Sequence, residues 1–246
     1  DLKSGNCNVF IGSCAGFCSD ASNKNVSIGH DAGKGRCAGD CNVAIGHAAL
    51  VGSCPASGNT GGLNVAVGPS AGMSVTSGAS NTFLGHMAGA YMTTGSNNIF
   101  MGKYAAGNNS AIVTGDNNTA LGMYAGAKMT SGSDNIAIGC KALGCCAVTG
   151  AHNIVLGTAA GCRVTSGACN IFIGKDTGSK CGSNGTNNVF LGNYAGYYTA
   201  TSSYSIFIGR EAGKMFCAGD NNIGMGYEAL KGSGTHANNS GTYNIA

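Results

Sequence analysis

The chain has 246 residues, of which 44 are Gly and only 2 are Pro, and just 9% are charged against about a quarter in an average globular protein. The glycines follow no three-residue period, which excludes collagen, and the apolar fraction of 43% argues against disorder. The net charge of +3 is scattered and no apolar stretch approaches the roughly 20 residues of a membrane span, so we expect neither nucleic-acid binding nor membrane insertion.

A five-residue phrase first appears at residues 8–12 and then recurs along the whole chain. It consists of Asn, a β-branched residue, a variable residue, an aliphatic residue and a closing Gly. The further copies occupy residues 25–29, 42–46, 64–68, 81–85, 98–102, 118–122, 135–139, 153–157, 170–174, 188–192, 205–209 and 222–226, and another begins at 244. The closing glycines are mostly 17 residues apart, and such a period predicts stacked coils that each bury a face against the next.

Each coil should contain a short strand, because β-branched residues at alternate positions are typical of extended chain. The Ala-Gly pair that follows most closing glycines predicts a second short strand, and a polar loop then returns to the next phrase. We therefore expect an all-β fold, a β-solenoid or β-roll of about 13 coils with a 17-residue base period. The array fills residues 1–246 as one domain that begins and ends inside a repeat.

The first residue of the phrase predicts a ladder of side-chain amides, because Asn carries both a donor and an acceptor that can bond the coils on either side. Ser205 interrupts this column, and the ladder should weaken there. The proposed members are Asn8, Asn25, Asn42, Asn64, Asn81, Asn98, Asn118, Asn135, Asn153, Asn170, Asn188 and Asn222.

The middle residue of the phrase should point away from the two aliphatic residues that flank it. If those flanking residues fill the coil, the middle column forms an exposed apolar stripe of a kind that soluble monomers rarely display. We therefore expect it to contact identical chains in a parallel homotrimer, although a coil that curls enough could fold it into its own interior. The stripe contains Phe10, Phe83, Phe100, Phe172, Phe190 and Phe207.

The pattern N-[VIT]-x-[IL]-G-x-x-A-G, seen over essentially the whole chain, resembles the head repeats of YadA-like trimeric autotransporter adhesins. It is still more similar to the N-T-A-I-G-x-x-A-G arrays of phage and virus tail-fibre proteins. The resemblance implies a trimeric β-solenoid shaft for surface display and host attachment, located outside the cell or on a virion or cell surface.

Residues with reactive side chains are few, and the sequence predicts no enzyme and no cofactor. His30 and His47 share a column on adjacent coils and are weak candidates for a metal site, with exposed turn residues as the alternative. Glu211 and Glu228 also stack, but a solvated face explains them better than acid–base chemistry.

The chain has 13 Cys, which points to an oxidising setting and to bridges between adjacent coils. Cys37 with Cys54 and either Cys145 or Cys146 with Cys162 are the candidate disulfides, with reduced, buried thiols as the alternative. Glycan acceptors are permitted by sequence at four loop sequons, whereas the sequon at Asn25 should be blocked inside the ladder. These loop sequons are Asn108, Asn117, Asn184 and Asn238.

The leading hypothesis for function is a structural and adhesive fibre segment whose partners are identical chains and a surface glycan or receptor. One alternative is an extracellular filament subunit that polymerises end to end. Another is an ice- or glycan-binding solenoid that uses a Thr column, whose members are Thr76, Thr93, Thr130 and Thr165.

Overall fold

The structure is a computed structural model that describes residues 5–19, 21–36, 38–52, 59–107, 112–180, 184–232 and 241–246. Its chain falls into two compact units, Asp1–Tyr124 (unit 1) and Ala125–Ala246 (unit 2). Each unit is a β-solenoid in which one short strand per coil pairs in parallel with the strand of the next coil. The all-β solenoid with a 17-residue period is therefore confirmed.

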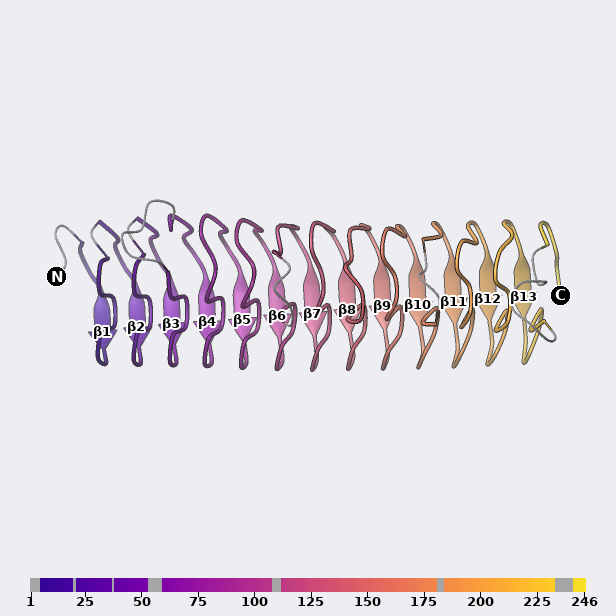
Figure 1. Cartoon of the computed structure of the whole chain (residues 1–246), viewed down its shortest axis with the longest axis horizontal. Helices are drawn as coiled ribbons and strands as arrows, with labels where there is room; N and C mark the ends of the chain where they lie inside the picture. The colour runs from indigo at the N-terminus through magenta and orange to yellow at the C-terminus, as the bar shows by residue number, and fades with distance from the viewer. Residues whose placement is uncertain are drawn as a thin grey trace. The chain divides into compact units, whose positions relative to one another are not determined.

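Every strand has three residues and corresponds to the second, third and fourth residues of the repeated phrase (Figure 1). Unit 1 contains β1 (Val9–Ile11), β2 (Val26–Ile28), β3 (Val43–Ile45), β4 (Val65–Val67), β5 (Thr82–Leu84), β6 (Ile99–Met101) and β7 (Thr119–Leu121). Unit 2 contains β8 (Ile136–Ile138), β9 (Ile154–Leu156), β10 (Ile171–Ile173), β11 (Val189–Leu191), β12 (Ile206–Ile208) and β13 (Ile223–Met225). Within each unit the strands follow one another in chain order without crossovers.

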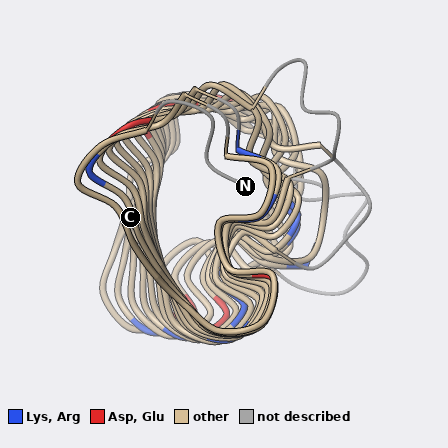
Figure 2. Cartoon of the chain, turned by 90° about the vertical axis from the view of Figure 1, so that its left-hand side faces the viewer, with Lys and Arg blue, Asp and Glu red and all other residues tan. Residues whose placement is uncertain are grey.

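The backbone repeats so regularly that successive coils of a unit trace nearly the same path when viewed along the stack (Figure 2). Parallel pairing aligns equivalent residues of neighbouring coils, so that Phe172 of β10 lies opposite Phe190 of β11, and Phe190 lies opposite Phe207 of β12. Each column of the sequence pattern is thus a column in space. None of the described residues belongs to a helix that could cross a membrane.

The prediction of a second strand around the Ala-Gly pair is wrong, because that segment forms a tight turn in the described coils. In the coil of β11, Tyr194 has a φ of 58° and Gly196 a φ of 57°. Two left-handed residues so close together reverse the chain direction, which an extended strand cannot do. The turns still bond to one another, since the N–H of Gly196 donates to the carbonyl of Ala212 at 2.9 Å.

The middle residue of each strand faces the interior of the coil, so the assignment of the Phe column to a contact between chains is wrong. Phe10 is half-buried, and the other members, Phe83, Phe100, Phe172, Phe190 and Phe207, are no more than 1% exposed. By contrast, Val9 and Ile11, which flank Phe10, are 47% and 57% exposed. The two aliphatic columns thus lie outside, and the Phe residues fill their own solenoid.

The interior accepts these rings because the fourth residue after the closing Gly is usually Gly as well. A Cβ atom on Gly196 would lie 2.5 Å from the Phe190 ring, and one on Gly213 would lie 2.4 Å from the Phe207 ring. In three coils the pattern is reversed: Leu occupies the fourth position and a small residue the middle of the strand. These pairs are Ala44 with Leu50, Ala137 with Leu143, and Gly224 with Leu230.

The two positions therefore share one volume inside the coil, and a large residue at one goes with a small residue at the other. Leu50 and Leu143 are fully buried, as the Phe rings are. The coil of β6 departs from the usual pairing of Phe with Gly. It has Phe100 in the middle of the strand and Ala106 at the fourth position.

Candidate functional site

The asparagine column forms a continuous ladder within each unit. In unit 1 the Asn64 Oδ1 accepts hydrogen bonds from both the backbone N–H and the Nδ2 of Asn81, each at 3.0 Å. The Asn81 Oδ1 accepts in turn from the backbone N–H of Asn98 at 2.8 Å. The Asn81 Nδ2 also donates to the carbonyl of Gly95, in the return loop that leads to the next phrase, at 2.9 Å.

Each asparagine stands just before a strand and bonds both the asparagine of an adjacent coil and the return loop that leads to the next phrase. Asn8 is half-buried, and the remaining members are at most 6% exposed: Asn25, Asn42, Asn64, Asn81, Asn98, Asn118, Asn135, Asn153, Asn170, Asn188 and Asn222. A buried backbone amide without a partner costs about 1–3 kcal/mol, so the side chains are needed to satisfy these groups. The ladder is a structural device that holds coil to coil.

The asparagine ladder is weaker at Ser205, as the sequence predicts. Its Oγ accepts from the backbone N–H of Asn222 at 3.3 Å, whereas the Asn188 Oδ1 accepts from the backbone N–H of Ser205 at 3.0 Å. The Asn222 Nδ2 bonds the carbonyls of Gly219 and Asp220 in its own coil, in addition to that of Gly241.

Exchanging Asn and Ser at equivalent positions of unit 2 should change stability in opposite directions. We expect Asn170→Ser to lower the free energy of unfolding by about 2–3 kcal/mol, because the Nδ2 bonds to Asn153 and Gly185 are lost in a buried site. Ser205→Asn should raise it by about 1 kcal/mol by completing the column. Urea unfolding followed by circular dichroism measures both, and a stabilising effect of Asn170→Ser would contradict a structural role for the ladder.

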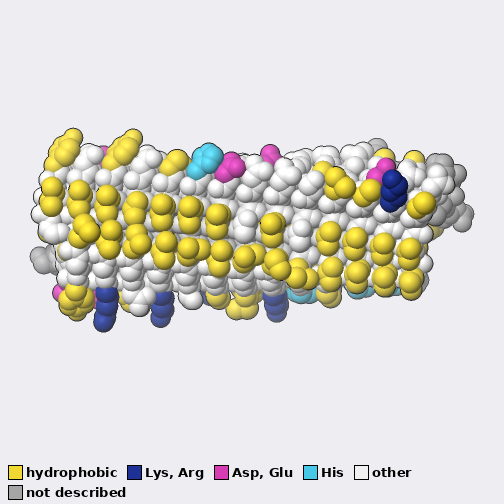
Figure 3. Space-filling model, turned by 180° about the vertical axis from the view of Figure 1, so that it is seen from behind, with side chains coloured by type: hydrophobic (Ala, Val, Ile, Leu, Met, Phe, Trp, Pro, Cys, Tyr) yellow, Lys and Arg dark blue, Asp and Glu magenta, His cyan; other side chains and the backbone are white. Residues whose placement is uncertain are grey.

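The outward-facing first and third residues of the strands form two parallel apolar columns, which we call the aliphatic face. Every residue in it is Val, Ile, Leu or Met except Thr82 and Thr119, and none is charged. In unit 1 Leu84 is 41% and Ile99 42% exposed, and in unit 2 Met225 reaches 59%. Figure 3 shows hydrophobic side chains in rows over the strands of each unit.

The two candidate metal ligands lie side by side on the turns of unit 1, with the rings of His30 and His47 stacked at a centroid distance of 5.4 Å. The His30 Nδ1 is 3.3 Å from an Asp31 carboxylate oxygen, and the pKa of Asp31 is lowered mainly by a hydrogen bond from Lys34. Within the described ranges, no group of three or more His, Cys, Asp or Glu side chains is arranged to hold a metal ion.

The sequence predicts Glu211 on a solvated face, and this prediction is wrong. Glu211 is 8% exposed and lies at the centre of an ion-pair network in unit 2. Its carboxylate lies 2.8 Å from the Nζ of Lys231 and 3.2 Å from the Nζ of Lys214. Lys231 also bonds the Glu228 carboxylate at 2.7 Å. Hydrogen bonds from Lys231 lower the pKa of both Glu211 and Glu228, so these carboxyl groups are held ionised and are poor proton donors.

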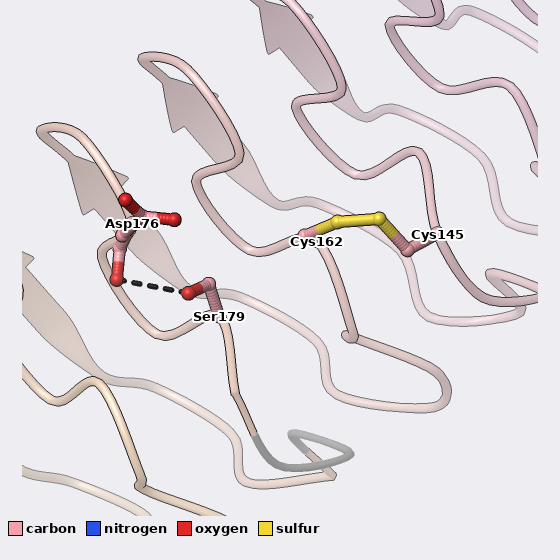
Figure 4. The surroundings of a disulfide bond; sticks show 4 residues. All are labelled: Cys145, Cys162, Asp176 and Ser179. Atoms are coloured by element: carbon pink, nitrogen blue, oxygen red, sulfur yellow. Dashed lines mark hydrogen bonds between the residues drawn. A yellow bond between two sulfur atoms is a disulfide. The ribbon is translucent and has the colours of Figure 1, made fainter.

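One disulfide bridges adjacent coils of unit 2, between Cys145 and Cys162, whose Cα atoms are 5.0 Å apart (Figure 4). The sequence allows two partners for Cys162, and the pairing with Cys146 is wrong. Cys146 is a free thiol. The next coil continues with Ser179, whose hydroxyl donates to the main-chain oxygen of Asp176 at 3.0 Å. Cys37 and Cys54 lie outside the described residues.

Two of the candidate glycan acceptors, Asn117 and Asn184, lie on exposed loops of the described chain. The Asn184 side-chain oxygen accepts a hydrogen bond from the Thr165 hydroxyl. Asn108 and Asn238 lie outside the described residues, and Asn25 is 6% exposed.

The Thr column does not present a free row of hydroxyls. The Thr76 Oγ1 donates to the carbonyl of Thr93 at 3.1 Å, and the Thr130 Oγ1 donates to the carbonyl of Val148 at 2.9 Å. These hydroxyls stabilise contacts between coils, which leaves them less able to order water at a flat surface.

Comparison with known proteins gives no family model, no curated protein and no solved structure that matches this chain. The candidate site must therefore be interpreted from its own chemistry. The sequence places the aliphatic face inside the coil and so misses its exposure to solvent. The reciprocal sizes of the middle and fourth positions are the signal that could have placed it correctly.

Proposed function

We propose that the chain is a structural and adhesive segment of a surface fibre that assembles as a parallel homotrimer through the aliphatic face. The observation that carries the proposal is the pair of exposed, uncharged aliphatic columns on the strands of each unit. On this view the protein acts outside the cell or on a virion or cell surface, and its role is mechanical rather than enzymatic.

Exposure of the aliphatic face to water is costly at this size. With members such as Ile99 at 42% and Ile154 at 36% exposure, the face of each unit presents on the order of several hundred Å² of apolar surface, the range at which patches usually mark an interface. A standard protein–protein interface buries roughly 800 Å² on each partner. The face of each unit is therefore of the order of size at which chains associate.

Identical chains are the proposed partners because the face is apolar along its length and offers no charges for a hydrophilic ligand to recognise. A parallel arrangement places the same columns of each chain at the same height, so that β-branched side chains can interdigitate. The number three comes from the resemblance of the repeat to trimeric fibre proteins, in which closure around an axis leaves no face exposed.

The attachment function is assigned to the turns and return loops, where exposed residue types vary widely from coil to coil. Tyr194, Tyr197 and Tyr198 illustrate this variation, since they gather on one coil of unit 2 with ring centroids 5.2 and 4.8 Å apart. Such half-buried aromatic side chains suit contact with a glycan or protein receptor.

A charge placed in the aliphatic face tests the assembly directly. We expect wild-type protein to have three times the mass of one chain in light scattering coupled to size exclusion, and Ile99→Glu to have the mass of one chain. The variant should retain its circular dichroism spectrum, because Ile99 is already 42% exposed. Association should weaken by more than about 100-fold, since burying an unpaired carboxylate costs several kcal/mol.

Met123→Glu is the matched control, because Met123 is a 47% exposed apolar residue of unit 1 that lies outside the strands. It should remain trimeric. Wild-type protein that stays a single chain at high concentration would refute the assembly, and filaments that lengthen with concentration would favour end-to-end polymerisation instead.

A further inference from the structure

Arg36 is buried inside unit 1, although arginine is rarely buried without an ion-pair partner. Only 3% of its surface is exposed. It lies seven residues after a closing Gly, a position at which other coils of unit 1 carry the apolar residues Val75 and Met92, both fully buried. The sequence therefore places a cation in a column that elsewhere fills the core.

The guanidinium group is only partly satisfied. Its Nη1 donates to the carbonyl of Val75 at 3.4 Å, and its Nη2 donates to the carbonyl of Gly61. Its Nε has no hydrogen-bond partner, and no carboxylate of the described chain forms an ion pair with it. Two neutral acceptors leave the Nε N–H without a partner and the positive charge without compensation.

Arg36 borders a small internal cavity whose other polar walls are serine hydroxyl groups and the amides of Asn25 and Asn42. Ser19, Ser22 and Ser27 line it together with Phe10 and other interior residues, and its volume is about 10 Å³. The three serines are at most 3% exposed. A cavity of this size holds about one water-sized particle, so a polyatomic anion such as sulfate does not fit.

Burial lowers the pKa of the Arg36 guanidinium to about 10, which still leaves it charged at neutral pH. A charged group in the core needs a counter-charge, because a bound water can satisfy the N–H but not neutralise the cation. The Ser19 and Ser22 hydroxyls donate to the carbonyls of Gly33 and Arg36, each at 3.4 Å, and from these long bonds a hydroxyl can turn its hydrogen toward an anion.

We propose that the cavity beside Arg36 is a binding site for a single chloride ion, held by the guanidinium and the surrounding serine hydroxyls inside the solenoid. The ion stabilises unit 1 by neutralising the one buried arginine of the described chain. This site is independent of the aliphatic face and of the proposed assembly.

Crystals grown in bromide provide the direct test, because bromide replaces chloride and scatters anomalously. We expect an anomalous peak in the cavity within hydrogen-bond distance of the Arg36 guanidinium. An empty or water-filled cavity at high bromide concentration would overturn the proposal.

Thermal unfolding gives a second test that uses the full chain. At constant ionic strength, replacing gluconate with chloride should raise the melting temperature by roughly 3–5 °C for each tenfold increase in chloride above its dissociation constant. Arg36→Met should remove this dependence, and Arg163→Met, at an exposed arginine, should retain it. Equal melting temperatures in the two salts would refute the site.

Discussion

Replacing Gly192 with Ala is expected to destabilise unit 2 by more than about 4 kcal/mol, or to prevent its folding. Gly192 closes the phrase of β11 with a φ of 128°, a conformation that is essentially restricted to Gly. A Cβ atom added there would lie 2.5 Å from the carbonyl oxygen of Gly209 and 2.6 Å from its carbonyl carbon. Both are backbone atoms of the next coil, so the clash is relieved only by separating the coils.

Gly226→Ala is the matched control, because Gly226 has the same φ of 128° but no atom of the described residues lies within 4 Å of the added Cβ. This variant should lose only the conformational strain, about 1–3 kcal/mol. Urea unfolding monitored by circular dichroism gives both values, and their difference measures how closely the coils must stack. Equal losses in the two variants would show that backbone strain alone explains why Gly closes the phrases.

The repeat period, the position of each strand and the asparagine ladder could be predicted because they follow from identical residues in identical columns. Stacking at a constant period brings Asn81 to Asn64 and Asn98 to Asn81 whatever the shape of the coil. The turn at the Ala-Gly pair could not be predicted in the same way. Its left-handed second position is occupied by residues as different as Tyr194 and Glu211, so no residue type marks it.

The direction of the strand faces could not be read from hydrophobicity, because both faces are apolar. The pleat shows only that Phe190 points opposite to Val189 and Leu191, and either choice buries large side chains. The disulfide partner of Cys162 was ambiguous for a related reason. One extra residue between Gly139 and Gly157 leaves the alignment of Cys145 and Cys146 with the next coil undetermined by counting.

Steric volume decides which face of the strand points into the coil. Phe190 and Gly196 test this directly. Phe190 is 1% exposed and its ring stacks between those of Phe172 and Phe207, at centroid distances of 4.9 and 5.0 Å. We expect Phe190→Ala to cost about 4 kcal/mol through the lost contacts and the cavity it leaves. Gly196→Leu alone should cost about 3 kcal/mol, because the added side chain meets the Phe190 ring.

The double variant recreates a pair that this chain already uses, since Ala137 and Leu143 occupy the same two positions in the coil of β8. Leu143 is fully buried with a φ of 48°, so Leu is compatible with the left-handed turn. Because Ala with Leu has nearly the volume of Phe with Gly, the double variant should be more stable than the sum of the single losses predicts, by at least about 2 kcal/mol.

Phe190→Ala combined with Gly89→Leu is the control for this coupling, since a side chain at the equivalent Gly89 of unit 1 would meet the rings of Phe83 and Phe100 instead of Phe190 or its stacking neighbours. Its two losses should simply add, within about 0.5 kcal/mol. Additive losses in the Phe190 and Gly196 pair as well would show that the two positions do not share one interior volume. Coupling in that pair alone would place the middle residue of the strand inside the coil by energetics, and would leave the aliphatic columns on the outer surface.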